Sequence, residues 1–395
     1  MQKAKGVTRR QVMKWALASG SFLSTSWSGR VFATAAKPEV IIAVCTPLSG
    51  VLAYNGKATV QGAQLALEQV NAKGGMGGRM FKLVIGDDAA NPKEAIPFLR
   101  KALMSEKACA VTGIVASDVA LAAKGFLEER KVANLPIMGS VNELVTEGTR
   151  YTFRLIGSVY QWQIAIPQFM KFMGVKRVAM VHEDSSYGRD SAKDFVPEAK
   201  RQGLDIVAVK MTPFTETNFI PIFNEVKGLE PEGIYFVYAG AINLFAARQM
   251  YEAGMRPKVR LGVYTTSLPY FPDGLKDIVI GYCSWGRPTK AKRIQEIAQI
   301  YETKYNQTLD MFACMGYDAI NVITEAAIRA KSDDPEAVRN EIAKTSYDGI
   351  CGYRIEFTKN GGTLKYQMYI NQWEKVGSGY RLNEIWHSDV IPPSV

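Results

Sequence analysis

The sequence lacks the short motifs that mark the best-known enzyme sites. It contains no P-loop pattern, no GxSxG, no HExxH, and no GxGxxG that follows a strand and opens a helix. The glycine cluster at 74–78 follows a helical segment instead of opening one, which favours a turn over a phosphate cradle. Histidine is also scarce, since His182 and His387 are the only two. These absences predict that the protein is not an enzyme, and we expect no cofactor and no bound metal.

Two acidic stretches are interpreted as structural. His182-Glu183-Asp184 follows an apolar strand-like run, and a solvated loop is favoured there over a metal or catalytic site. Asp87-Asp88 ends another such run, and we favour a loop that caps the next helix near Asn91-Pro92.

Cysteine is sparse and scattered, without a CxxC pair, which argues against zinc and against a thioredoxin-type centre. The five cysteines are Cys45, Cys109, Cys283, Cys314 and Cys351. An oxidising compartment permits a disulfide, and the odd count leaves at least one thiol unpaired. Because Cys45 and Cys109 lie in apolar strand-like runs, we expect both to be buried free thiols.

The positive charge is concentrated at the N-terminus. The formal net charge is +10, but residues 1–35 hold six basic residues and no acid, so that the remainder carries about +4. This excess is too small and too dispersed to predict nucleic-acid binding.

Residues 1–35 have the pattern of an export signal. The twin-arginine phrase TRRQVMK at 8–14 precedes a modest apolar stretch from Trp15, and Ala33-Thr34-Ala35 is a small-residue cleavage pattern. We expect cleavage near Ala35 and a periplasmic mature protein. No cysteine follows to carry a lipid anchor, and no later stretch reaches about 18 apolar residues, so we expect no membrane insertion after cleavage.

Strand and helix patterns alternate along the chain, and nearly continuous apolar strands indicate parallel sheets covered on both faces. A first series predicts strands at 40–45, 81–85, 108–115, 132–138 and 151–155, and helices around 60–70, 92–106 and 118–131. A second series predicts helices at 160–173, 187–202, 219–227 and 244–253, and strands at 177–182, 204–210, 233–238, 259–263 and 278–282. The repetition predicts an α/β protein with two similar doubly wound, Rossmann-like lobes.

The C-terminal part adds helices more than strands. Helices are expected at 291–305, 313–331 and 335–344, a hairpin from 353–357 and 364–370 around Asn360-Gly361-Gly362, and a further strand at 380–386. These helices are expected to complete an existing lobe.

Ligands of open parallel sheets bind at the carboxyl ends of the strands, so the loop at 46–56 and the later strand ends are candidate site regions. Ser117 and Ser140 stand at such ends, where two interpretations remain open: helix caps, with a capping-box spacing at 140–143, or donors for an anion. Aromatic residues recur at the same class of position, which favours a ligand pocket. They are Tyr54, Tyr160, Trp162, Tyr187, Tyr238 and Tyr264.

Several of these stretches resemble the leucine/isoleucine/valine-binding protein family, the type I periplasmic solute-binding proteins of ABC transporters. The resemblance covers nearly the whole mature chain. It rests on PLSG at 47–50, YNG at 54–56, QGA at 61–63, VNAKGG at 70–75, DDA at 87–89, NP at 91–92, YG at 187–188, AGM at 253–255 and FTKNGG at 357–362.

The resemblance implies two lobes joined by a three-strand hinge, with a ligand trapped between them by hinge closure. We expect residues 37–157 and 285–350 to form the first lobe, and 158–284 and 351–395 the second. The family pattern implies that Ser117 and the residues Ser140, Val141 and Asn142 hold a ligand carboxylate. Tyr54, Tyr160, Tyr187, Tyr238 and Tyr264 complete the predicted ligand-binding set.

The sequence departs from the family pattern in ways that affect the ligand. Amino-acid binders usually hold the ligand ammonium with acidic residues where this chain has Val159-Tyr160 and Tyr264-Thr265. Burying an ammonium without a carboxylate is costly. An aromatic or other organic acid therefore competes with a branched-chain amino acid as the expected ligand. The family's usual disulfide is not expected either, because Ala90 occupies one of its positions.

We predict a solute-binding protein that captures a small carboxylate for an ABC permease in the inner membrane. The alternative is a periplasmic ligand sensor that docks on a membrane signalling protein. Its lobes would look the same, so genomic neighbours would separate the two.

Overall fold

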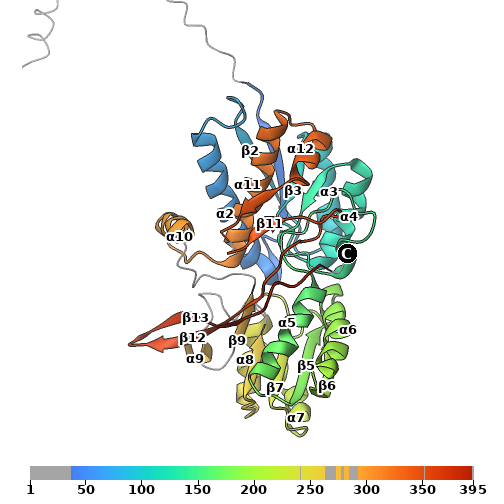
Figure 1. Cartoon of the computed structure of the whole chain (residues 1–395), viewed down its shortest axis with the longest axis vertical. Coiled ribbons are helices and arrows are strands. Elements are labelled where there is room, and N and C mark those ends of the chain that lie inside the picture. The colour runs from blue at the N-terminus through green and yellow to red at the C-terminus, as the bar shows by residue number, and fades with distance from the viewer. Residues whose placement is uncertain are drawn as a thin grey trace, which may run out of the picture. The chain divides into compact units, whose positions relative to one another are not determined.

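The computed structural model describes residues 37–240, 242–262, 273–276, 280–283, 292–350 and 352–393. The predicted export signal lies outside the described residues. The chain from Lys37 onward forms one unit, in which two sheets with their helices make two lobes (Figure 1). None of the helices in these ranges has the length and apolarity needed to cross a membrane.

The first lobe is built on a four-stranded parallel sheet in the order β2-β1-β3-β4. Val40 pairs with Phe81 and Thr46 with Asp87, so the first two strands run in register over their full length. The strands are β1 (Val40–Thr46), β2 (Phe81–Asp87), β3 (Ala110–Thr112) and β4 (Ala133–Leu135). Each occupies a predicted apolar run, because strands covered on both faces need apolar side chains on both.

Three helices of the first lobe, α3, α11 and α12, begin at side-chain caps. Asn91 accepts a hydrogen bond from the Lys93 amide at 3.0 Å, and Asp310 and Asp334 cap the two later helices in the same way. The helices are η1 (Gly50–Leu52), α2 (Ala53–Ala72), α3 (Pro92–Met104), α4 (Ser117–Arg130), α10 (Lys292–Tyr305), α11 (Met311–Ala330) and α12 (Pro335–Ile342). Helix α11 packs on α2 and α12, while α3 packs on α4. The late helices thus pack against elements of the first sheet and its helices.

The α2–α11 contact is unusually close because glycines face the partner helix. A Cβ atom built on Gly62 would lie 1.9 Å from the carbonyl oxygen of Ala313, and one on Gly316 would lie 2.2 Å from that of Thr59. No side chain fits in either place, so the sequence permits this approach only with glycine.

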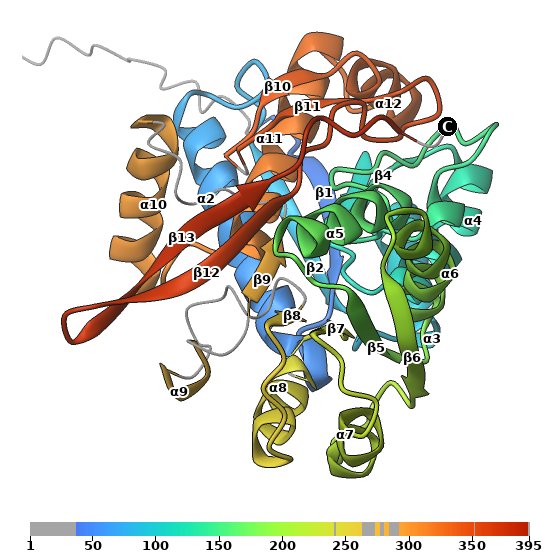
Figure 2. The ribbon, with the colours of Figure 1, turned by 60° about the horizontal axis from the view of Figure 1, so that its bottom comes forward.

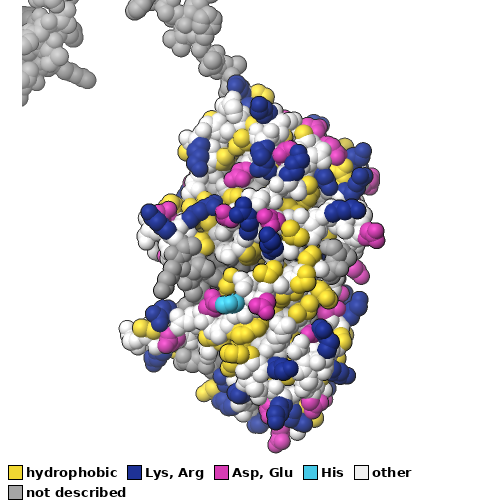
Figure 3. Space-filling view, in the orientation of Figure 1, with side chains coloured by type: hydrophobic (Ala, Val, Ile, Leu, Met, Phe, Trp, Pro, Cys, Tyr) yellow, Lys and Arg dark blue, Asp and Glu magenta, His cyan; other side chains and the backbone are white. Residues whose placement is uncertain are grey.

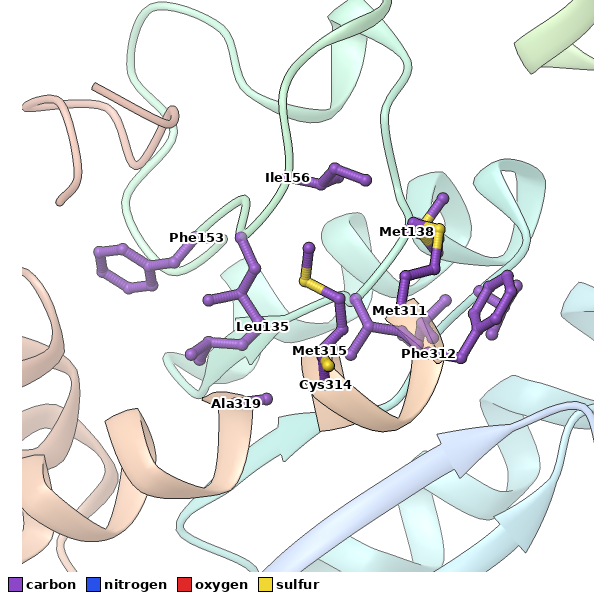
Figure 4. Close-up of a cluster of buried hydrophobic side chains, with 14 of the residues drawn as sticks. Leu135, Met138, Phe153, Ile156, Met311, Phe312, Cys314, Met315 and Ala319 are labelled. Atoms are coloured by element: carbon purple, nitrogen blue, oxygen red, sulfur yellow. The ribbon is translucent and has the colours of Figure 1, made fainter. Parts of the chain in front are cut away.

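The amino-terminal turns of α11 carry the apolar side chains that fill the space beneath the strand ends. Met311, Phe312 and Met315 lie in one buried cluster with Leu135 and Met138 (Figure 4). Because closely packed side chains in a core resist displacement, this cluster supports Met138.

The second lobe is built on a seven-stranded sheet in the order β13-β12-β9-β8-β7-β5-β6. Strands β5 to β9 are parallel, and the C-terminal strands β12 and β13 add two antiparallel members at one edge. The strands are β5 (Arg177–Glu183), β6 (Asp205–Thr212), β7 (Gly233–Val237), β8 (Val259–Gly262), β9 (Ile280–Cys283), β12 (Tyr369–Val376) and β13 (Gly379–His387). Figure 2 shows the β12–β13 hairpin as a long ribbon whose tip points away from the sheet.

Alternation along the central strands of this sheet divides the buried side chains between two cores. On β5, Val178 and Met180 join the main core, whereas Ala179 and Val181 join a second core. Helices α5 and α6 pack on each other, as do α7 and α8. The helices are α5 (Val159–Phe172), α6 (Ser186–Arg201), α7 (Ile220–Lys227), α8 (Ile242–Glu252) and α9 (Asp273–Lys276).

One predicted strand and one predicted hairpin pairing are wrong. Residues 151–155 form a single bridge, Asn134 to Thr152, because the Glu128 carboxylate accepts the amides of residues 150–152. The hairpin predicted around residue 361 also stops at one bridge, Phe357 to Thr363. There the carbonyl of Gly361 accepts the Arg154 amide at 2.8 Å, so the tail packs along residues 154–156 instead.

The antiparallel pairs at the C-terminal end form elsewhere. One joins β10 (Ser346–Asp348) to β11 (Arg354–Glu356), and the other joins β12 to β13. The predicted strand at 380–386 is confirmed as β13.

The prediction for cysteine is confirmed. Cys45 and Cys109 are buried free thiols, and Cys314 is buried and forms no disulfide. Burial raises the pKa of the Cys45 thiol, which lies near the Asp88 carboxylate. The neighbouring acids are also structural: the Asp87 carboxylate accepts the amides of Leu48 and Ala89, each at 2.8 Å.

Candidate functional site

A cavity of about 200 Å³ lies where loops from both sheets meet. Every loop that lines it follows the carboxyl end of a parallel strand or begins a helix, the usual site position in open α/β sheets. The first lobe contributes Leu52, Ala90, Val115, Ala116, Ser117, Asp118, Met138 and Ser140. The second lobe contributes Trp162, Glu183, Asp184, Ser185, Tyr187, Phe214 and Ala239.

Ser117 and Ser140 lie in this lining, 9% and 2% exposed. Neither caps a helix: Ala116 is the residue before α4, and the short turn η2 (Asn142–Leu144) follows Val141 without a side-chain cap. The capping interpretation is therefore wrong for both serines. Neither hydroxyl is committed to a hydrogen bond within the described residues, so both remain available to a molecule in the cavity.

The amino end of α4 adds backbone donors beside Ser117. The first intrahelical bond at this end runs from the Ala120 amide to the Ala116 carbonyl, so the amides before Ala120 have no helical acceptor. Such amides, together with the helix dipole, favour an anion at this end. The wall around Ser117 is consequently rich in donors for an acceptor group.

The second-lobe wall is aromatic. Trp162 and Tyr187 meet edge to face, with ring centroids 5.9 Å apart and planes inclined by 78°. The Ser185 hydroxyl holds the start of α6 by accepting the Gly188 amide at 3.1 Å, which fixes the position of Tyr187. These rings present an apolar surface to the cavity, suited to the apolar body of a ligand.

Glu183 is the main site residue that sequence reasoning missed. The solvated-loop interpretation is wrong for this stretch, because Glu183 ends β5 and is 1% exposed, while His182 is 5% exposed. The Glu183 carboxylate accepts the Ser185 hydroxyl at 2.7 Å and the Ala239 amide at 2.8 Å. Burial, with a smaller contribution from the Asp118 charge, raises its pKa to about 7. The available signal was the apolar run at 178–181, beyond which the strand continues through His182 to residue 183.

Glu183 is expected to make the ligand-free protein less stable as pH rises. Its folded-state pKa of about 7 lies above the unfolded value of about 4.3. The folded state therefore binds the proton more tightly, and stability is lost from about pH 4 to pH 8, by on the order of 3 kcal/mol. Urea unfolding at pH 5 and pH 8 should show that Glu183→Gln removes this part of the slope. Equal slopes in variant and wild type would contradict the assignment.

Other charged groups near Glu183 set the background of that measurement. The Asp184 carboxylate pairs with Arg189 and is exposed, and burial lowers the pKa of His182. Asp88 adds a change of the same sign, because burial raises its pKa to about 6. The comparison between wild type and variant cancels these shared contributions.

The structure places the remaining predicted residues outside the cavity lining. Tyr54 is half-buried on α2 against the core, and Tyr160 is 39% exposed on α5. Val141 is buried, and its carbonyl accepts a hydrogen bond from Arg154 at 2.5 Å. Tyr264 lies outside the described residues.

Asn142 and Tyr238 differ most from expectation. The Asn142 side-chain amide donates to Asp194 at 2.6 Å, and its carbonyl oxygen accepts the Tyr160 amide at 3.0 Å, so it is occupied by α5 and α6. Tyr238 is fully buried in the second core and its hydroxyl bonds to Thr212 at 3.0 Å. The polar groups of both side chains are hydrogen-bonded within the protein. Of the predicted ligand-binding set, Ser117, Ser140 and Tyr187 lie in the cavity lining.

The surface gives no sign of a polyanion site on the face shown in Figure 3. Basic side chains are spread over both lobes, and apolar side chains gather across the middle of this face (Figure 3). Within the described residues, no group of three or more His, Cys, Asp and Glu side chains is arranged to hold a metal ion.

The chain is similar in sequence to known proteins. The family described as periplasmic binding protein matches residues 39–379. Leu/Ile/Val-binding protein homolog 3 of Brucella melitensis is 27% identical over 320 residues, covering 80% of this chain and 86% of that protein.

Two solved structures share the fold. A solute-binding protein of an ABC transporter from Rhodopseudomonas palustris, in complex with 3,4-dihydroxybenzoic acid, has a TM-score of 0.80 at 19% identity, covering 90% of this chain and 99% of that one. A branched-chain amino acid transporter substrate-binding protein from Streptococcus pneumoniae, in complex with isoleucine, has a TM-score of 0.78 at 21% identity, covering 90% and 100%. The expected fold class, two Rossmann-like lobes, is confirmed.

Proposed function

Because the chain belongs to the periplasmic binding protein family, we propose that it captures a small carboxylate in the cavity and delivers it to an ABC permease. The observation that carries this proposal is the pair of uncommitted hydroxyls, Ser117 and Ser140, in the cavity wall at the amino end of α4. We further propose that the mature protein works in the periplasm, where its family acts.

A carboxylate fits this wall for a chemical reason. An ionised carboxylate only accepts hydrogen bonds, so it needs donors on every side that the protein covers. The two serine hydroxyls and the first amides of α4 are such donors, and the helix dipole adds a favourable potential. A sugar or a polyamine would leave these donors poorly used.

The apolar side of the cavity restricts the rest of the ligand. Leu52, Met138, Trp162 and Tyr187 present aliphatic and aromatic surface to the same space. A branched aliphatic side chain or an aromatic ring would bury its apolar area there. A branched-chain or related amino acid and an aromatic acid both fulfil this requirement, as do the ligands named for the two solved neighbours.

Both lobes contribute to the lining, which supports closure around the ligand. A ligand shifts the equilibrium toward the closed state by the free energy of the contacts that it makes in the closed state and not in the open state. We propose hinge closure on this basis. The lobe boundaries at residues 157, 284 and 350 and the three-strand hinge form part of the same proposal.

The purified mature protein is expected to bind carboxylates and to be stabilised by them. At a ligand concentration of about 100 times Kd, the gain is about 2.7 kcal/mol, which raises Tm by roughly 3 to 5 °C. Because Trp162 lies in the lining, its fluorescence should change in the same titration. Leucine, isoleucine, benzoate and 4-hydroxybenzoate form the panel.

Glucose and putrescine serve as controls without a carboxylate. If glucose or putrescine changed Tm or fluorescence and none of the four carboxylates did, the proposal would be overturned. Mass spectrometry of the released ligand completes the experiment, since a binding protein returns the ligand unchanged and an enzyme does not.

A further inference from the structure

We propose that Glu183 recognises a hydrogen-bond donor on the ligand, so that the ligand is a carboxylate that also carries an ammonium or hydroxyl group held between Asp118 and Glu183. This inference rests on the proposed function, since it concerns the same cavity. It adds a specificity-determining residue and narrows the ligand class.

The carboxylate of Glu183 is fixed at the cavity wall from two sides. Ser185 donates to one of its oxygens at 2.7 Å and the Ala239 amide donates to the other at 2.8 Å, and both of these residues line the cavity. Each carboxylate oxygen can accept a second hydrogen bond. The group is therefore oriented in advance and still has acceptor capacity for a donor in the cavity.

The charges around the cavity have one sign. The lining contains the carboxyl groups of Asp118, Glu183 and Asp184, and none of its described residues is a lysine, an arginine or a histidine. Asp184 is paired with Arg189 at the surface, so its charge is compensated. Asp118 and Glu183 remain, and the negative charge of Asp118 repels that of Glu183.

Asp118 and Glu183 come from different lobes, one on α4 and one at the end of β5. Bringing the lobes together brings these acids together, at a cost unless a proton or a ligand donor lies between them. The Ser186 hydroxyl already donates to Asp118 and does not change its charge. A ligand donor at this place would remove the repulsion and favour closure.

The same geometry disfavours a carboxylate without such a donor. Asp118 follows Ser117 directly in α4, so a ligand carboxylate at the serines lies near a like charge. The buried Arg154 guanidinium is close to the Ser140 loop, but it donates to the Val141 carbonyl and does not line the cavity. An ammonium or hydroxyl group on the ligand would donate a hydrogen bond to these carboxylates and so offset the negative charge, which no basic side chain among the described residues of the lining does.

Ligand pairs that differ only in the donor test this on the wild-type protein. Leucine is compared with 4-methylpentanoate, which lacks the ammonium, and 4-hydroxybenzoate with benzoate, which lacks the hydroxyl. We expect the donor-bearing member of at least one pair to bind about 10- to 100-fold more tightly, the effect of one hydrogen bond to a charged group. The pair that responds identifies the donor as ammonium or hydroxyl.

The variant Glu183→Gln assigns the effect to this residue. Its amide can still accept the Ala239 amide and donate to Ser185, so the fold is expected to persist. The preference within the responding pair should fall to about threefold or less, because a neutral amide loses the charge assistance. Glu252→Gln is the matched control, since that carboxylate pairs with Arg248 on α8 and is absent from the cavity lining.

The outcomes separate this inference from the proposed function. If no carboxylate binds to the wild type, the proposed function fails. If both members of each pair bind equally, or if Glu183→Gln keeps the wild-type preference, only the role of Glu183 fails. The wild-type comparison remains decisive even where the variant is poorly folded.

Discussion

Replacing Ser117 and Ser140 together by alanine is expected to weaken carboxylate binding by roughly a thousandfold. A hydrogen bond to a charged group contributes about 1.5 to 3 kcal/mol, so each single variant should lose about 10- to 100-fold. The two serines share one ligand group, and their effects need not add. Isothermal titration with the tightest carboxylate of the panel measures all four proteins.

Stability is expected to stay unchanged in these variants. Neither serine caps a helix, and alanine at the first position of α4 slightly favours the helix. Ser105→Ala, an exposed serine at the end of α3, is the matched control for both binding and Tm. A fall in Tm without a loss of affinity would mean that the hydroxyls serve the fold, and the carboxylate site would have to lie elsewhere.

Gly62→Ala or Gly316→Ala is expected to lower the free energy of unfolding by about 3 kcal/mol. The added methyl group would meet a backbone carbonyl of the partner helix at 1.9 Å in the first case and 2.2 Å in the second. Alanine gains about 1 kcal/mol in helix propensity, which is too little to offset the separation of two packed helices. Thermal unfolding should show a loss of roughly 3 to 5 °C in Tm.

Gly125→Ala is the control with the opposite sign. Gly125 is exposed inside α4, and a methyl group added there would meet nothing within 4 Å. The same substitution there should stabilise the protein by about 0.5 to 1 kcal/mol. If all three variants behaved alike, the close α2–α11 contact would not be a feature of the folded protein.

The strand and helix pattern was accessible from the sequence because it depends on local features. The strands predicted at 40–45 and 177–182, for example, are β1 and β5, each of which is one residue longer than predicted. The hairpin near residue 361 failed because its outcome depends on a distant partner. The Gly361 carbonyl accepts the Arg154 amide, and the Thr363 hydroxyl donates to the carbonyls of Arg154 and Ile156, so residues 361–363 are held by a segment about 200 residues earlier.

The cavity shows the same division. Ser117, Ser140 and Tyr187 were found because they follow strand ends, and position along the strand is a local property. Asn142 was wrongly expected to bind the ligand. Its backbone amide donates to Asp190 and its side-chain amide donates to Asp194, and only the packing of α6 reveals these contacts. Glu183 was missed because its burial depends on Ser185 and Ala239, and the latter comes from a different strand end.

The packing of α11 on α2 has a consequence for how the chain acquires its fold. Helix α2 ends at residue 72 and α11 begins at residue 311, with the whole of α5 to α8 between them. During synthesis, α2 therefore cannot pack on α11 until the intervening segments have been made. Contacts of such long sequence separation slow folding and leave apolar surface exposed to chaperones and proteases in the meantime.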